Sequence, residues 1–439
     1  MSLTMLTSSI VAMAKIPVAL SIRTADAILK FATLVFTAAG DATVVDLVLG
    51  VIGHSLEATG RSLGEASQVW RGIFTNSTNE ATLRYALDHL YELIRFLYDL
   101  FKPGNVIPRF PAADGTIENG AVEFPGRDNP YNELDLRQAV NRRAIIYQVN
   151  RVLLTLSIIL KKGRESASEG LERLEINASL PSDFDQDGNP PPPTYLSRLV
   201  SSPGRWTNQK WLFVNGVANE FVWFQLSCDK IRDTFGREVK GIYNRSDGIL
   251  WDLIECAGEH SAAGKNDLIE RTPSSKAAEE ILKRELTDAL WPVSGAAPNK
   301  VVMIAHSQGC MILRLALQTL VKETKNSDRR SQMKERLRVF TFGNPSIDWR
   351  VVDATETERS LSDYAKITEH FAHLADFVAR VGVVGHRYDQ DSGYGEQSVF
   401  ISKNGKAHLF GAHYPLGAEA YENGTNAKLF EAVGGEEIA

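Results

Sequence analysis

From about residue 210 the chain alternates short apolar runs with segments of helical length. The apolar runs are residues 210–216, 238–244, 300–307, 336–344, 367–376 and 397–403. The helix-length segments between them are residues 219–235, 274–290 and 309–324. Strands that alternate with helices predict a mostly parallel sheet with helices on both faces. We therefore expect residues 205–439 to form an α/β domain, with its chemistry at the carboxyl ends of the strands.

Residues 1–181 carry a different pattern and predict a mainly helical region. An apolar stripe at helical spacing ends at Pro103 and Gly104, residues 106–131 read as a loop, and a second long helix is expected from about Asn132 to Lys162. These helices could form a lid or an acyl-binding wall, a layer that faces a membrane, or a structural layer packed on its own domain. The sequence leaves these alternatives open.

Residues 182–204 are expected to be a linker, because Pro190 to Pro193 favour extended polyproline II backbone. Asp183, Asp185 and Asp187 resemble the first half of a calcium loop. However, Thr194 stands where that loop needs a bidentate glutamate, so calcium binding is not expected.

Charge argues against one class of partner. The net charge of −6 and the absence of any Lys/Arg run give phosphate backbones no basic surface to bind, so we do not expect nucleic acid as a partner. Charged residues also break the apolar N-terminal segment before it could span a bilayer; they are Lys15, Arg23, Asp26, Lys30, Asp41 and Asp46. Peripheral membrane contact stays open, and the oligomeric state is not encoded in any motif.

The cysteines indicate a reducing compartment. Cys228, Cys256 and Cys310 are odd in number and widely spaced, which favours neither a disulfide framework nor a zinc site. The short apolar stretch at the N-terminus has no basic residue before it, unlike a secretory signal. We expect a cytoplasmic protein that is soluble or peripherally attached to a membrane.

The stretch "VVMIAHSQGC", residues 301–310, predicts a nucleophilic serine. Ser307 stands between an expected strand and an expected helix, which is the context of a nucleophile elbow. Ala305 replaces the first glycine of the GxSxG pattern, and Gly309 keeps the second. A serine hydroxyl is a weak nucleophile unless a base and an orienting acid accompany it.

Candidates for the acid and the base follow in the expected chain order. Asp376 ends a predicted strand and is the favoured acid, with Asp348 and Asp353 in reserve; a helix-capping or turn role is the structural alternative for Asp376. His408 and His413 follow the last predicted strand. We favour His408 as the base and keep His413 as the alternate, because only geometry can decide between them.

Two backbone N–H groups are needed to bind an oxyanion. Gln308 opens the helix after the serine and is expected to give one of them. Val217 is expected to give the other, from the turn that Gly216 permits after the first strand of this domain. This set of residues requires neither a metal nor an organic cofactor.

These motifs together resemble the α/β-hydrolase superfamily, and lipases and esterases in particular, over about 206–430. "AHSQG" is similar to the GHSxG elbow, "FTFGNP" to the FGxP segment, "HLADFVARVG" to the acid segment, and "NGV" to the His-Gly oxyanion loop. The resemblance implies an α/β-hydrolase fold, a Ser307–Asp376–His408 triad and a small acyl or lipid-like substrate. Ala305, Asn215 and Ala379 depart from the family pattern, but none of these departures removes a catalytic group.

The leading functional hypothesis is a serine hydrolase that cleaves a carboxylic ester or a related acyl bond, such as a lipid ester or lactone, through an acyl-enzyme. An alternative keeps the same residues for acyl transfer, condensation or cyclisation, because water exclusion decides the fate of an acyl-enzyme. A second alternative is a non-catalytic interaction protein on the same scaffold.

Overall fold

A computed structural model describes residues 129–148, 150–151, 154, 178–183, 187–199, 208–248, 252, 272–325, 327–352 and 358–439. Most of the predicted N-terminal helical region lies outside the described residues, including the apolar stripe before Pro103. Asp185, Cys256 and Asp353 lie outside them as well.

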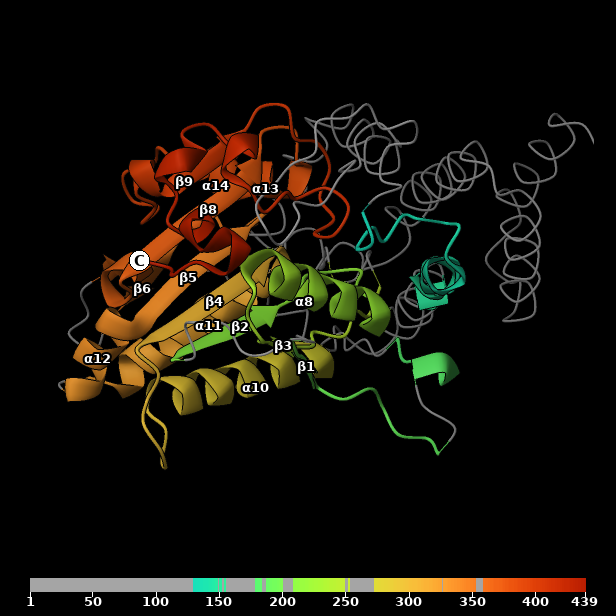
Figure 1. The fold of residues 1–439 in the computed structure, drawn as a ribbon, viewed down its shortest axis with the longest axis horizontal. Helices are drawn as coiled ribbons and strands as arrows, with labels where there is room; N and C mark the ends of the chain where they lie inside the picture. Colours follow the sequence, from blue (N-terminus) through green and yellow to red (C-terminus); the bar gives the residue numbers. More distant parts are fainter. Residues whose placement is uncertain are drawn as a thin grey trace, which may run out of the picture.

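The core of the described chain is one seven-stranded sheet, shown in Figure 1. Its strands are β1 (Thr194–Ser197), β2 (Gln209–Val214), β3 (Val239–Ile242), β4 (Lys300–His306), β5 (Leu337–Phe342), β8 (Ile367–His373) and β9 (Val399–Ser402), in the spatial order β1-β3-β2-β4-β5-β8-β9. All neighbouring pairs are parallel except β1 with β3. The predicted α/β class with a mostly parallel sheet is confirmed.

Helices cover both faces of the sheet, and the alternation within each strand explains why. Trp211 and Phe213 of β2 point into a core shared with α8 (Phe221–Phe235) and the C-terminal η7 (Leu429–Gly435). Leu212 and Val214 point the other way, into a core shared with α10 (Pro273–Leu290) and α11 (Gln308–Glu323). Successive side chains of a strand face opposite sides, so a continuous apolar run serves both layers.

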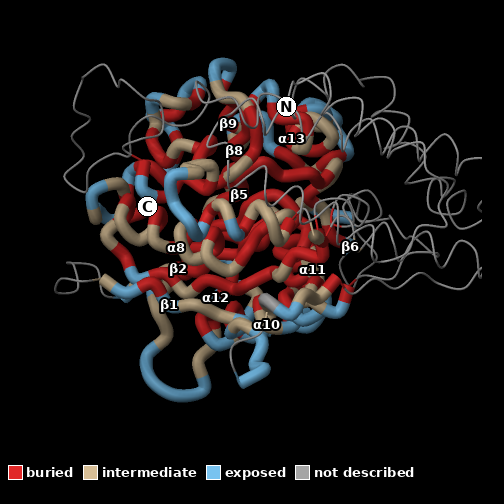
Figure 2. Tube along the Cα trace, turned by 90° about the vertical axis from the view of Figure 1, so that its right-hand side faces the viewer, coloured by how far each residue is buried: buried red, intermediate tan, exposed pale blue. Residues whose placement is uncertain are grey.

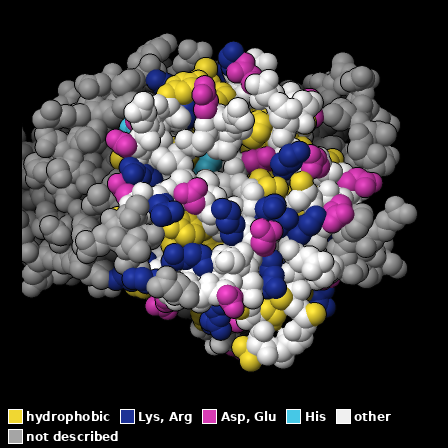
Figure 3. Space-filling model, turned by 90° about the vertical axis from the view of Figure 1, so that its left-hand side faces the viewer, with side chains coloured by type: hydrophobic (Ala, Val, Ile, Leu, Met, Phe, Trp, Pro, Cys, Tyr) yellow, Lys and Arg dark blue, Asp and Glu magenta, His cyan; other side chains and the backbone are white. Residues whose placement is uncertain are grey.

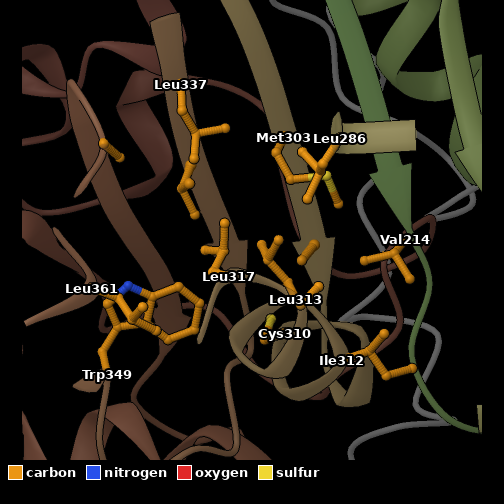
Figure 4. Close-up of a cluster of buried hydrophobic side chains, with 14 of the residues drawn as sticks. Val214, Leu286, Met303, Cys310, Ile312, Leu313, Leu317, Leu337, Trp349 and Leu361 are labelled. Atoms are coloured by element: carbon orange, nitrogen blue, oxygen red, sulfur yellow. The ribbon is translucent and has the colours of Figure 1, made fainter. Parts of the chain in front are cut away.

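The second of these cores holds the helix that follows the predicted nucleophile. Figure 4 shows Leu313 and Leu317 of α11 among side chains of the sheet and of Trp349 and Leu361. Cys310, on the same helix, is fully buried. The beginning of α11 is therefore fixed by packing on the sheet. Figure 2 shows that the buried residues follow the strands, while exposed residues lie in the loops and on the outer sides of helices such as α10.

The remaining elements are short and connect or flank the sheet. They are η2 (Pro181–Asp183), α12 (Asp328–Arg336), the two-stranded β6 (Arg350–Val352) and β7 (Glu358–Ser360), η3 (Leu361–Tyr364), α13 (Phe377–Val381), α14 (Val383–His386), η4 (Glu396–Ser398), η5 (Ala418–Ala420) and η6 (Gly424–Asn426).

Two boundaries differ from the sequence prediction. The sheet begins at β1, inside residues 182–204 where we expected a linker, because the chain after the prolines pairs with β3. The predicted helix from Asn132 is helical only from residue 139 in the described chain. The side chains of Asn132 and Asp135 accept hydrogen bonds from the N–H groups of Leu134 and Arg137, which favours turns over helix.

The described surface is mixed in charge. On the face shown in Figure 3, Lys and Arg side chains are interspersed with Asp and Glu. None of the described helices has the length and apolarity that crossing a bilayer requires.

Glu369 of β8 ties the C-terminal segment to the sheet and is expected to make stability depend on pH. Its buried carboxylate accepts hydrogen bonds from the N–H groups of Lys428 (2.7 Å) and Leu429 (3.2 Å). Burial outweighs these bonds and raises the pKa of Glu369 to about 7. The folded state therefore binds the Glu369 proton more tightly than the unfolded state does. The stabilisation that this protonated side chain contributes is complete below the unfolded pKa of 4.5 and is lost as pH rises through 7.

The change to test is Glu369→Gln, which cannot titrate. We expect the wild-type free energy of unfolding to lose about 3 kcal/mol from this group between pH 4.5 and pH 8, and the variant to lack that part of the decline. Urea unfolding at several pH values measures it, with Glu396→Gln on the exposed η4 as the control. Equal pH dependence in wild type and Glu369→Gln would show that the group is not shifted.

Candidate active site

Ser307 sits at a sharp turn between β4 and α11. Its backbone has φ 56° and ψ −128°, an orientation that non-glycine residues rarely adopt, and its N–H donates to the carbonyl of Phe342 (2.9 Å). Gly309 lies against the β2 end, since an added Cβ would stand 2.6 Å from the Asn215 carbonyl oxygen. The turn therefore has the strained strand-to-helix geometry expected of a nucleophile elbow. The Ser307 Oγ is buried and makes no hydrogen bond to a described residue.

Asp376 and His408 are joined by a hydrogen bond. The distance from His408 Nδ1 to Asp376 Oδ2 is 2.6 Å, and both side chains are buried. Asp376 follows β8 and His408 follows β9, so two neighbouring parallel strands deliver them to the same edge of the sheet. Asp376 also caps α13 through the N–H of Val378 (3.0 Å), so the capping role and the contact with a histidine occur together.

Ser307 lies beside this pair. The ring of His306, the preceding residue, is centred 4.7 Å from the ring of His408. Gly343 follows the residue that accepts from the Ser307 N–H, and a Cβ there would stand 2.9 Å from His408 Cε1 and 3.1 Å from Asp376 Oδ2. The three predicted residues therefore lie at the same edge of the sheet, and His408 Nε2 is the ring nitrogen that the aspartate does not engage.

His413 is held differently. Its Nδ1 accepts a hydrogen bond from the backbone N–H of Leu409 (3.0 Å), which closes a turn within the segment that carries both histidines. We call residues 407–414 the histidine loop. The hydrogen bonding thus places His408, and not His413, on Asp376. Of the reserve acids, Asp348 forms an ion pair with Arg314 (3.4 Å), and Asp353 lies outside the described residues.

Tyr414 completes the surroundings of Asp376 and was not predicted. Its hydroxyl donates to Asp376 Oδ2 at 2.6 Å, beside the bond from His408, and its ring stacks on His373 at 4.0 Å. Burial and the neighbouring carboxylate raise the pKa of Tyr414, so it remains a donor. Only its position next to His413 marked it in the sequence, and adjacency does not reveal a contact with a residue 38 positions earlier.

The predicted oxyanion loop adjoins the serine. A Cβ on Gly216 would stand 2.3 Å from the Ser307 Cβ, so the backbone of 216–217 approaches Ser307 as closely as glycine allows. Gln308 begins α11, where the first N–H groups have no partner within the helix. The predicted donors Gln308 and Val217 therefore flank the serine from two elements.

Two asparagines fix the geometry of that loop. Asn215 accepts from the N–H of Asn244 (2.9 Å) and donates to its carbonyl (2.8 Å), and Asn244 Nδ2 donates to the Gln308 side chain (2.7 Å). Asn215 thus links the ends of β2 and β3, and Asn244 extends the connection to the first turn of α11. Asn244 was not predicted, because a pairing between neighbouring strand ends appears only in three dimensions.

Backbone strain gathers at this site. Among the described residues, positive φ outside glycine occurs at Ala218, Ser307, Ala407 and Asn423. Ala218 lies in the predicted oxyanion loop, where its N–H donates to Asp252 (2.9 Å), and Ala407 precedes His408. Strain of this kind persists where the surrounding structure holds a functional arrangement. Burial raises the pKa of Asp252 to about 7.

Two further buried histidines hold the backbone around His408. His306 Nε2 lies 2.7 Å from the carbonyl oxygen of His408, and His373 Nδ1 lies 3.2 Å from that of Ala407. A carbonyl only accepts, so both nitrogens carry the proton. Burial lowers the pKa of His306 well below its usual range and that of His373 to about 4, which keeps both rings neutral at pH 7.

The closeness of Gly216 to Ser307 leads to a testable prediction. In Gly216→Ala the new methyl group must push the loop or the serine aside, so we expect kcat for the ester hydrolysis predicted from the sequence to fall about 10- to 100-fold, and the free energy of unfolding to fall by about 1 to 3 kcal/mol. Steady-state kinetics and urea unfolding measure both. Gly395→Ala is the control, because its added Cβ meets only the Ser398 side chain at 3.2 Å in an exposed loop. Full activity of Gly216→Ala would show that this loop takes no part in the reaction.

Within the described residues, no group of three or more His, Cys, Asp and Glu side chains is arranged to hold a metal ion. No family model and no curated protein matches the chain.

Proposed function

We propose that the protein is a serine hydrolase with the α/β-hydrolase fold, which cleaves a carboxylic ester or a related acyl bond such as a lipid ester or lactone. The observation that carries the proposal is the buried Asp376–His408 hydrogen bond beside a serine in a strained strand-to-helix turn. The chain order of serine, acid and histidine, each after a parallel strand, is the order found in that superfamily.

Each residue has a role that its contacts support. Ser307 Oγ attacks the acyl carbonyl, and His408 Nε2 takes the hydroxyl proton and later gives it to the leaving alcohol. Asp376 holds His408 with its proton on Nδ1 and stabilises the imidazolium that forms. The hydrogen bond from Ser307 to His408 is expected to form when substrate binds, since such bonds are often long without it.

The developing oxyanion is bound by the N–H groups of Gln308 and Val217. These donors belong to a packed helix start and to a loop fixed by Asn215, so they need little rearrangement as charge appears. Water then attacks the acyl-enzyme with His408 as base and releases the acid. The overall change is hydrolysis of one acyl bond, and a small acyl or lipid-like molecule is the expected substrate.

The test is covalent labelling with a fluorophosphonate probe, followed by peptide mapping. We expect the folded wild type to label at Ser307 and heat-unfolded protein to remain unlabelled, because reactivity depends on the assembled site. A panel of esters and lactones of increasing chain length then finds the substrate. Folded protein that neither labels nor hydrolyses any member would refute the proposal and favour a non-catalytic interaction protein on this scaffold.

A second function, acyl transfer or cyclisation, is favoured by one observation. Ser307 is 0 % exposed and His408 is 5 % exposed, and exclusion of water lets another nucleophile capture the acyl-enzyme. Product analysis with and without an added alcohol or amine separates the two reactions. If the main product is the acylated alcohol or amine and not the free acid, the reaction is acyl transfer and not hydrolysis.

A further inference from the structure

Polar side chains from other elements form hydrogen bonds to backbone groups along most of the histidine loop. His373 and His306 hold the carbonyls of Ala407 and His408, as described above. Beyond His408, Lys230 of α8 donates to the carbonyls of Phe410 (2.7 Å), Gly411 (3.0 Å) and Tyr414 (2.6 Å). The loop is therefore rigid at the residues that place the imidazole.

Residues that precede the sheet in the chain bind the same part of the loop. Glu133 Oε1 accepts from the N–H of Gly411 (2.8 Å), and Glu133 Oε2 accepts from the N–H of Ala412 (2.7 Å). Asn129 Nδ2 donates to the Gly411 carbonyl (3.0 Å). A Cβ on Gly411 would stand 2.0 Å from the Tyr131 carbonyl oxygen, so this position must be glycine for the segment to approach.

The segment that carries Glu133 is itself docked on α8. Tyr131 donates to Asp233, Trp223 donates to Asn141 (3.0 Å), and Gln148 donates to Glu220 (2.8 Å). Figure 1 shows this part of the chain, in teal, beyond the end of α8. The contacts place residues 129–148 across both α8 and the histidine loop.

Glu133 and Lys230 bond the same loop residue, Gly411, through its N–H and its carbonyl. Glu133 is 2 % exposed and Lys230 is 1 % exposed. Burial outweighs the opposite charge of the partner at both groups, so the pKa of Lys230 is lowered to about 7 and the pKa of Glu133 is raised. Burying two polar side chains with so many backbone partners is costly unless each hydrogen bond is made, which favours the one conformation of the loop that makes them all.

We propose that Glu133, together with Lys230, is a positioning residue that sets the place of His408 by clamping the histidine loop from the N-terminal part of the chain. The proposal rests on the proposed function for its catalytic consequence. The clamped amides lie three and four residues after His408, and the same loop carries Tyr414, which bonds Asp376. A shift of the loop would therefore displace the base and a donor to its acid together.

The experiment compares Glu133→Gln with Asp135→Asn in the full chain. An amide at position 133 has one acceptor for two N–H donors, so its NH2 group must face an N–H of the loop. Asp135 is a matched control, since its carboxylate on the same segment bonds the exposed Arg137 and does not touch the loop.

Two readouts are needed. The first is the far-downfield NMR signal of the His408 Nδ1 proton in protein labelled with ¹⁵N-histidine, which reports the bond to Asp376 without any substrate. The second is steady-state kinetics on an ester. We expect Glu133→Gln to shift or broaden the proton signal and to lower kcat about 10- to 100-fold with KM unchanged within about twofold, while Asp135→Asn changes neither.

The outcomes distinguish failure of the proposed role of Glu133 from failure of the proposed function. If Glu133→Gln folds and leaves both readouts unchanged, or changes the signal without changing kcat of an active wild type, Glu133 does not position the base. If wild type neither labels nor hydrolyses, the proposed function fails, but the proton signal still decides whether Glu133 holds His408. If Glu133→Gln does not fold, Asn129→Ala removes one clamp contact, and an unchanged signal there overturns the proposal.

Discussion

Replacing His408 with alanine is expected to lower kcat for an ester by about 10⁵-fold or more, whereas His413→Ala should cost about tenfold or less. His408 is the histidine bonded to Asp376, so its loss removes the base and leaves Ser307 without a proton acceptor. His413 contacts the backbone N–H of Leu409, so its loss weakens a turn. We expect that turn to contribute about 1 kcal/mol to stability.

The comparison needs the residual rate without a nucleophile, which we call the floor, and a check that each variant folds. Ser307→Ala gives the rate that remains without a nucleophile, and His408→Ala is expected to approach it because the members of such a set act as a unit. Fluorophosphonate labelling should show the same ranking, and circular dichroism checks that both histidine variants fold. If His413→Ala falls to the floor while His408→Ala retains activity, the base is His413 and the bond between His408 and Asp376 is structural.

Much of the sheet was predictable because its strands are buried on both faces. A run such as 337–342, buried throughout, must be a strand inside a layered protein. The edge strand β1 was missed for the converse reason. Its residues are mostly half-exposed, they follow four prolines, and only pairing with β3 makes them a strand. Local composition indicated a linker there.

The positions of Ser307, Asp376 and His408 followed from a similar argument. Each comes after a predicted parallel strand, and the carboxyl ends of such strands share an edge. The residues that hold them did not follow. Glu133 lies 278 positions from Gly411, Tyr414 lies 38 positions from Asp376, and neither belongs to a recognisable motif. Contacts between loops depend on how layers pack, which periodicity does not encode.

Asp376→Asn is the second variant expected to have a large effect. Three donors surround this carboxylate, since Oδ2 accepts from His408 and Tyr414, and Oδ1 accepts from the N–H of Val378. An asparagine has one acceptor oxygen, so it must give up either the helix cap or the two donors at Oδ2. In the first arrangement the negative charge that stabilises the imidazolium is still lost, and in the second the NH2 group favours a proton on Nε2, the wrong tautomer. We expect kcat to fall about 10³- to 10⁴-fold in either case.

Tyr414→Phe is the matched comparison for this effect, because it removes one of the three donors and keeps the charge and the bond to His408. We expect it to lower kcat by no more than about tenfold, because only one hydrogen bond from a neutral donor to the carboxylate is lost. The NMR signal of the His408 Nδ1 proton should persist in Tyr414→Phe and disappear or move strongly in Asp376→Asn. Activity within tenfold of wild type in folded Asp376→Asn would mean that this carboxylate is only the cap of α13. The orienting acid would then have to be sought elsewhere, because a helix cap needs an acceptor but an imidazolium needs a charge.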